Sequence, residues 1–521
     1  MQNLFKKLIK SLIFGAVFLI PVILIYYTNS VLPMSGHEFR IPFGREFLNP
    51  EHGRYIATAF GNTFFEQLPR ILNIHVLDFR SSGILFSVII LSISIFSIIG
   101  YGFLLFFEKT DNHKHWLWLL CYIVTFLIFF NHNFRYLYHA DLVIFFEYTS
   151  SLIPYLTSLS IVFWIFSKQK IPSNLIFGLF LCSSFFTGIS IEALNIPYFL
   201  FLCAITLFVA IDYRKDINNE TKKQILKIFI FALIINTISC AFYYLKPVDH
   251  DMNDKDFLLS AWKSFFPVIF DKFINKYIIF HLISLIGLGA IAFRRKNFQN
   301  QNVRFFAVIV FNTVSLLTFC FLGNYYIFCM YDIGCLLGEE KYFLTYVATL
   351  FFQNFVIWGY YFATSSDKKS VKILYAEIGV ILLILAANYQ YFQGYLTEMT
   401  RWRNEASHWR KRQYCVEKLM VAQAGKETIT FPNIYWDYDS LGDKAFLFCL
   451  MIVHYPDFKN LKTIVVDNSL PFDDFMEKEA DDYKFSNLLQ HKIEQYEGDY
   501  SLVFEEIKEE NDKVIFELQH Y

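Results

Sequence analysis

Long apolar runs separated by short polar segments dominate the first 392 residues of the chain. A helix that crosses a bilayer needs about 20 mostly apolar residues. The pattern therefore predicts eleven membrane-spanning helices, at residues 9–29, 83–107, 115–131, 149–167, 174–190, 194–213, 227–245, 277–293, 305–323, 344–364 and 373–392. Residues 174–213 form one almost continuous apolar stretch, and Glu192, Asn195 and Pro197 divide it into two spans joined by a very tight turn.

From residue 393 onward the apolar runs shorten and charged residues return. An amphipathic helix is expected over 401–423 and another helix near 440–454. Alternating apolar and polar positions predict four strands and a polar turn between the last two, namely strands 426–431, 461–467, 500–507 and 514–518 and turn 509–512. The expected fold is mainly α, a membrane helical bundle over 1–392 with a small α/β domain over 393–521.

Basic residues occupy every second connection between the predicted spans, and this orients the bundle. They are Lys6, Lys7 and Lys10, then Lys109 and Lys114, Lys168 and Lys170, Arg214 to Lys227, Arg294 to Arg304, and Lys368 to Lys372. Because cytoplasmic loops are enriched in Lys and Arg, the N-terminus is expected inside and the C-terminal domain outside. The first apolar run could also be a cleaved signal peptide, but its length and Pro21 favour an uncleaved anchor.

Composition agrees with a membrane protein and excludes several other classes. Phe, Tyr and Trp number 62, 33 and 8, and charged residues are only 18% of the chain, against roughly a quarter in soluble domains. The net charge of -1 gives no field that would attract nucleic acid. The sequence has no CxxC, HExxH or metal-type Cys/His spacing. It also lacks a Gly-rich phosphate loop, and its short inner loops leave no room for a nucleotide-binding domain, which argues against an ATP-driven pump. Two cysteine pairs could form disulfides on the outer side, Cys329 with Cys335 and Cys415 with Cys449.

The first predicted outer loop carries the most informative candidate site. Glu38 lies close to the end of the first span, beside His37 and Arg40, with Arg54 further along. A carboxylate at headgroup depth can deprotonate an acceptor hydroxyl or hold a divalent ion such as Mg²⁺ or Mn²⁺. Arginines can bind the phosphate of a lipid-linked donor through paired hydrogen bonds. The alternative is that these charges are solvated or paired with one another.

Other outer segments add further candidates for substrate binding. His139 and Asp141 lie in the second outer segment, and Lys341 precedes the tenth predicted span. Glu192 stands in a turn with almost no other polar side chain. A carboxylate there is costly unless it is paired or hydrated, so Glu192 indicates either a polar cavity or simple surface exposure.

Four short motifs resemble a known group of enzymes. They are Gly36-His-Glu-Phe39, His52-Gly-Arg-Tyr55, Gly188-Ile-Ser-Ile-Glu192, and a tail that opens with Trp402 and Arg403 and continues through Thr428-Ile-Thr-Phe-Pro432. The chain resembles the polytopic GT-C glycosyltransferases, and more closely uncharacterised bacterial membrane proteins similar to O-antigen glucosyltransferases. One departure is that His37-Glu38 stands where the family usually has adjacent acids.

The resemblance implies a bacterial inner-membrane enzyme that uses a polyprenyl-phosphate sugar as donor. The acceptor would be a glycan or lipid of the cell envelope, on the outer membrane face. By that analogy Glu38 is the catalytic base or a metal-linked acid, and Arg54 and Glu192 line the site. Two other readings stay open, a transporter or flippase and a non-catalytic assembly protein for an envelope glycan. Against transport, the predicted spans carry almost no charge apart from Glu377, and no internal repeat is evident.

Overall fold

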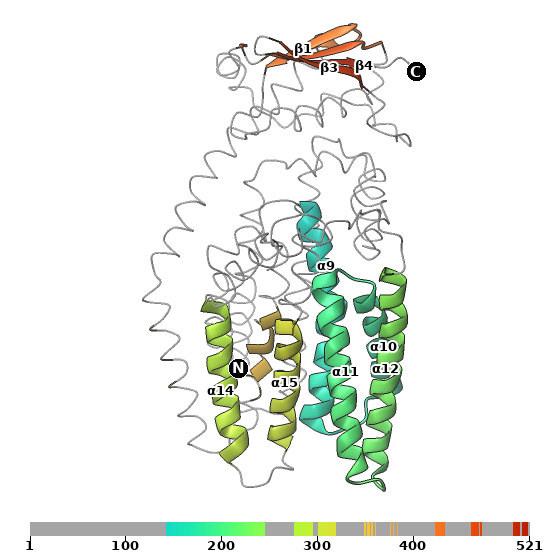
Figure 1. The fold of residues 1–521 in the computed structure, drawn as a ribbon, viewed down its shortest axis with the longest axis vertical. Coiled ribbons are helices and arrows are strands. Elements are labelled where there is room, and N and C mark those ends of the chain that lie inside the picture. The colour runs from blue at the N-terminus through green and yellow to red at the C-terminus, as the bar shows by residue number, and fades with distance from the viewer. Residues whose placement is uncertain are drawn as a thin grey trace, which may run out of the picture.

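The computed structural model describes residues 142–244, 276–294, 301–318, 422–432, 460–467, 469–470, 504–510 and 513–518, with scattered helical positions between 349 and 383. Most of these residues are helical, and a small sheet lies in the C-terminal part. In Figure 1 the helices form an upright bundle, and the sheet lies beyond one end of it.

Six of the predicted spans are helices in the structure. They are α9 (Leu142–Lys168), α10 (Asn174–Gly188), α11 (Glu192–Arg214), α12 (Glu220–Tyr244), α14 (Lys276–Arg294) and α15 (Gln301–Thr318). Among the described helices, α9, α11 and α12 contain stretches long and apolar enough to cross a membrane, while α10, α14 and α15 contain shorter apolar stretches. The described helices are therefore those of a membrane protein. Predicted spans 9–29, 83–107 and 115–131 lie outside the described residues, and those at 344–364 and 373–392 are described only at scattered positions.

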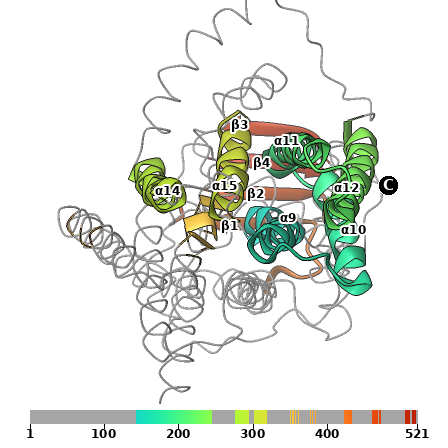
Figure 2. The ribbon, with the colours of Figure 1, turned by 90° about the horizontal axis from the view of Figure 1, so that it is seen from below.

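Helix α9 is the most enclosed of these helices. It packs against α10 and α15, while both α10 and α11 pack against α12 (Figure 2). Phe163 of α9 lies between Phe305 and Phe352, with ring centroids 6.1 and 6.0 Å away. By contrast α12 presents large apolar side chains to its surroundings, including Phe231 and Phe242, as a helix that faces lipid does.

The four strands form one sheet in the order β1-β2-β4-β3. Strand β1 (Thr428–Pro432) is parallel to β2 (Thr463–Asp467), whereas β4 (Lys513–Leu518) is antiparallel to both β2 and β3 (Phe504–Glu510). One face carries the buried apolar side chains of alternate positions, which are Ile429, Phe431, Ile464, Val466, Val514, Phe516 and Leu518. The predicted strands are confirmed, although their ends differ by a few residues.

The largest difference in the sheet concerns the polar turn that was expected over 509–512. Glu509 and Glu510 belong to β3 instead, because they pair with Val514 and Lys513 across the ladder. The expected helices at 401–423 and 440–454 lie outside the described residues, apart from the last positions of the first.

The side chain of Gln423 covers the outer edge of β1. Its amide nitrogen donates to the carbonyl oxygen of Thr430 at 2.9 Å, and its amide oxygen accepts from the Thr430 backbone N–H at 2.8 Å. These are the two hydrogen bonds that a neighbouring strand would make. Gln423 therefore satisfies β1 at a position where an open edge could pair with another chain.

Candidate functional site within the helical bundle

The residues that the sequence singles out for catalysis and binding are almost all outside the part of the chain that the structure describes. This holds for His37, Glu38, Arg40, Arg54, His139, Asp141 and Lys341. Glu192 is the exception, since its backbone forms the first residue of α11.

The turn before Glu192 explains two positions of the Gly188-Ile-Ser-Ile-Glu192 motif in structural terms. Gly188 ends α10 where it meets α12, and a Cβ atom there would lie 2.9 Å from the Cβ atom of Ser239. Ser190 donates its hydroxyl to the carbonyl oxygen of Thr187 at 2.6 Å. Asn195 donates to the carbonyl oxygen of Ser190 at 3.1 Å and closes the turn. The division of residues 174–213 into two helices is thus confirmed.

Small polar side chains join α9, α10, α11 and α12 inside the bundle. Ser158 donates to Ser183 at 2.7 Å, and the hydroxyls of Ser184 and Tyr198 lie 2.8 Å apart. Asn236 of α12 donates to the backbone carbonyl of Ser184 at 2.9 Å. All five side chains are buried. Their hydrogen bonds are the kind that holds helices together where no water is present.

A second group of buried polar side chains lies between α9, α14, α15 and the helical residues near 350. We call it the His281 cluster, and its members are Tyr155, His281, Asn312, Thr313, Thr349, Gln353 and Asn354. Each is at most 3% exposed. Tyr155 also meets Tyr198 edge to face, with ring centroids 5.8 Å apart, so this cluster adjoins the serine contacts of α10 and α11.

His281 is held at both ring nitrogens. Its Nδ1 lies 2.8 Å from Oδ1 of Asn354 and its Nε2 lies 2.8 Å from Oγ1 of Thr313. Since an amide oxygen only accepts, Nδ1 carries the proton and donates to Asn354. In the neutral ring Nε2 is then an acceptor, and the Thr313 hydroxyl lies within hydrogen-bond distance of it. His281 is thereby fixed in orientation and tautomer by α15 and by the residues near 350.

The hydroxyl of Thr313 has more neighbours than it has hydrogens. Besides Nε2 of His281, the carbonyl oxygen of Ile309 and Oε1 of Gln353 each lie 2.9 Å from it. One hydroxyl hydrogen serves one of these acceptors. If the Gln353 carboxamide turns over, its nitrogen donates to Thr313 and the hydroxyl hydrogen is free for His281. The cluster can therefore exchange hydrogen-bond partners without any change of fold.

The His281 cluster suits the binding of uncharged polar groups. None of its members other than His281 can carry a charge near neutral pH, and α9, α14 and α15 have charged residues only near their ends. Within the described residues no group of three or more His, Cys, Asp or Glu side chains lies close enough to hold a metal ion. The chemistry offered here is hydrogen bonding by amides, hydroxyls and one imidazole.

The sequence pattern does not single out this cluster, because its members lie within the predicted spans rather than in the outer loops and are neutral rather than charged. The available signal was a set of neutral polar residues inside apolar runs, namely His281 in span 277–293, Asn312 and Thr313 in span 305–323, and Gln353 and Asn354 in span 344–364. Such residues are uncommon within the membrane and often functional.

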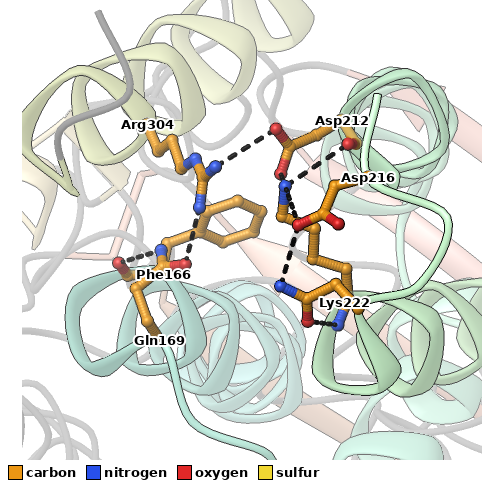
Figure 3. A network of polar contacts seen from close by, with 7 residues as sticks. Phe166, Gln169, Asp212, Asp216, Lys222 and Arg304 are labelled. Carbon is orange, nitrogen blue, oxygen red and sulfur yellow. Dashed lines mark hydrogen bonds and ion pairs between the residues drawn. The ribbon is translucent and has the colours of Figure 1, made fainter. Parts of the chain in front are cut away.

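Charged residues lie together at the end of the bundle where α11 ends and α15 begins (Figure 3). Arg304 of α15 contacts Asp212 of α11 at 3.1 Å and donates to Gln169, just after α9, at 3.0 Å. Lys222 of α12 lies 3.5 Å from Asp212 and 3.6 Å from Asp216. This network, which we call the ionic end, ties four helices together. It also gathers at one end three of the basic segments that the sequence assigns to one side of the membrane.

In the sheet, Asp467 is a buried carboxylate with a complete set of partners. Lys513 contacts it at 2.8 Å, and the backbone N–H and hydroxyl of Ser469 both donate to it, at 2.9 and 2.6 Å. Lys513 first, and then Ser469, hold the pKa of Asp467 below its usual range although burial opposes this. Asp467 fixes the end of β2 against β4.

Comparison of the chain with models of known protein families gives no match, and comparison with curated proteins finds no similar sequence.

Proposed function

We propose that this chain is a membrane glycosyltransferase. It transfers a sugar from a polyprenyl-phosphate carrier to a glycan or lipid of the cell envelope, on the outer face of the bacterial inner membrane. The proposal includes eleven spans over 1–392 and an extracytoplasmic domain over 393–521. It is supported by the motifs that resemble the GT-C class and by the helical, membrane type of the described bundle.

The observation that carries the proposal is the difference between the two ends of the bundle. At the ionic end the connections between α9 and α10, α11 and α12, and α14 and α15 are all short, and each contains a lysine or arginine. At the other end lie the turn before Glu192, the last residue of α12 and the first residue of α14, and in the sequence the last two are separated by the long segment 245–275. A lipid-linked sugar presents its phosphate at the membrane surface, so an enzyme for it needs its long segments and its acids together at one such surface.

The reaction uses Glu38 as general base. Its carboxylate takes the proton of an acceptor hydroxyl, and that oxygen attacks the anomeric carbon from the face opposite the carrier. The bond from the anomeric carbon to the phosphate oxygen breaks, and both its electrons leave with the polyprenyl phosphate. Arg40 and Arg54 stabilise the negative charge that develops on the departing phosphate.

The test is the substitution Glu38→Gln, which keeps the size of the side chain and removes its basicity. We expect loss of the envelope-glycan decoration in cells that contain the variant at wild-type level. Glu51→Gln, in the same predicted loop, is the matched control and should leave decoration unchanged. Normal decoration in the Glu38→Gln strain would remove the proposal. Loss on deletion of the whole chain, with every outer-loop point variant normal, would favour the non-catalytic assembly protein.

A second candidate function, a transporter or flippase, is favoured by one observation in the bundle. Buried polar side chains cross several helices in the His281 cluster, and the ionic end closes one side of the bundle. Vesicles that contain the purified protein separate the two functions. Transfer of labelled sugar from a polyprenyl-phosphate donor supports the transferase, whereas movement of that donor across the bilayer without transfer supports transport.

A further inference from the structure

Two side chains of the His281 cluster have a polar atom with no partner among the residues that the structure describes. Within that part of the chain the amide nitrogens of Asn312 and Gln353 make no hydrogen bond, and both residues are fully buried. Each amide oxygen has a hydroxyl within hydrogen-bond distance, that of Tyr155 at 3.4 Å from Asn312 and that of Thr313 at 2.9 Å from Gln353. Buried polar groups in folded proteins are nearly always paired. Two unpaired amides in one cluster therefore call for an explanation.

Turning the amides over does not remove this deficit. A half-turn of the Gln353 carboxamide directs its nitrogen to Thr313 and leaves its oxygen open instead. The same exchange at Asn312 directs the nitrogen to Tyr155. In either orientation each side chain keeps one open hydrogen-bonding position, a donor in one case and an acceptor in the other. A partner therefore accepts in one orientation or donates in the other, and a hydroxyl oxygen can do either.

The described members of the cluster do not favour a charged partner, because none apart from His281 can carry a charge near neutral pH. The charged residue of α15 is Arg304, which lies about 12 Å along the helix axis from Asn312 and is engaged with Asp212. A phosphate or carboxylate would find no Lys or Arg among these members, and a buried charge without a counter-ion is strongly unfavourable. Amide, hydroxyl and imidazole side chains instead match the hydrogen-bonding pattern of an uncharged hydroxyl.

We propose that the His281 cluster is a binding site for uncharged hydroxyl groups, which complete the hydrogen bonding of Asn312 and Gln353. The hydroxyl comes either from ordered water or from a neutral sugar. Asn312 and Thr313 lie in the last two turns of α15 and His281 in the second turn of α14. The site therefore lies in the half of the bundle away from the ionic end. This inference does not depend on the proposed transferase activity.

Pairs of apolar substitutions in the purified full-length protein test the proposal by the sign of their effect. Tyr155→Phe first removes the donor to Asn312, and Asn312→Leu is then added to it. A bound hydroxyl predicts that this second step lowers the thermal midpoint, by about 1–2 °C for each lost hydrogen bond in a chain of this length. A dry site predicts a rise, because leucine removes an unpaired polar group. Thr313→Val followed by Gln353→Met is the independent second pair.

A rise or no change in both pairs would overturn the proposal. Loss of folded protein only on the second substitution counts as the predicted fall. The two sources of the hydroxyl are then separated with glucose, at up to about 100 mM. A rise of the midpoint in wild type that exceeds the rise in the double variants assigns a sugar, since general stabilisation by the solute affects all of them alike. Equal rises, together with the fall in the pairs, assign water.

Discussion

Replacing Gly188 by alanine should loosen the contact between α10 and α12. Alanine favours a helix over glycine by about 0.5–1 kcal/mol, so propensity alone predicts a more stable protein. At Gly188, however, the new methyl group would lie 2.9 Å from the Cβ atom of Ser239 and 3.0 Å from the amide nitrogen of Asn236, and would overlap the Ser239 hydroxyl. Carbon atoms in contact prefer about 3.5–4.0 Å, and rotation of the serine side chain does not move its Cβ atom.

The two helices must therefore separate by roughly 0.6–1 Å, which also strains the bond from Asn236 to Ser184. Over-packing of this size costs about 1–3 kcal/mol, equivalent to a fall of about 1–3 °C in the thermal midpoint of a purified protein of this length. Gly178→Ala is the matched control, because Gly178 lies in the same helix with no atom within 4 Å of its added methyl group. It should be neutral or stabilising.

A second substitution identifies the origin of the loss. Ser239→Gly removes the clashing Cβ atom, so the double variant with Gly188→Ala should lose less stability than the two single variants together. The remaining cost comes from Asn236, whose amide end can shift. A Gly188→Ala variant as stable as Gly178→Ala would refute the reasoning, because the helices would then not meet at this distance.

Three further outcomes are expected. Arg304→Met should lower the thermal midpoint more than Arg304→Lys, which keeps the positive charge but not the simultaneous contacts with two partners. Lys223→Met, at an exposed ion pair, is the control and should change the midpoint little. Equal effects of all three variants would mean that the ionic end does not stabilise the bundle. Asp467→Asn should destabilise the sheet by about 1–3 kcal/mol at neutral pH. Because the pKa of this carboxyl is depressed in the fold, the stability it provides is present above about pH 4 and is lost as the pH falls further; hydrogen exchange of the sheet amides, measured against pH, should show that loss in wild type and not in the variant. Gln423→Ala should speed the exchange of the Thr430 amide hydrogen by tenfold or more, since about 1.4 kcal/mol corresponds to a factor of ten, and unchanged exchange would mean that Gln423 does not protect the strand edge.

The sequence was sufficient where local chemistry decides the structure. Asn195 and Pro197 mark the start of α11, and the alternation through Val514–Leu518 matches a strand with one buried face. The order of the strands could not be predicted from it, because β4 pairs not only with its neighbour β3 but also with β2, which lies much earlier in the chain.

The contacts of the bundle were out of reach for the same reason. That His281 meets Asn354, and that Arg304 meets Asp212, depends on how helices distant in sequence come side by side. Polar residues inside apolar runs identify candidates, but not their partners. The basic residues, in turn, predict only the membrane orientation, since an ion pair between the ends of two distant helices leaves no periodic signal.

The ionic end has a mechanical consequence for the bundle. Four helices joined at one end by charged contacts can tilt about that end, which then serves as a pivot, while their far ends spread. Helix α11 is about 34 Å long at 1.5 Å per residue, so a tilt of about 5° would displace its first residue by about 3 Å. That residue is Glu192. A small rotation at the ionic end therefore moves Glu192, at the far end of α11, by a distance comparable to the length of a hydrogen bond.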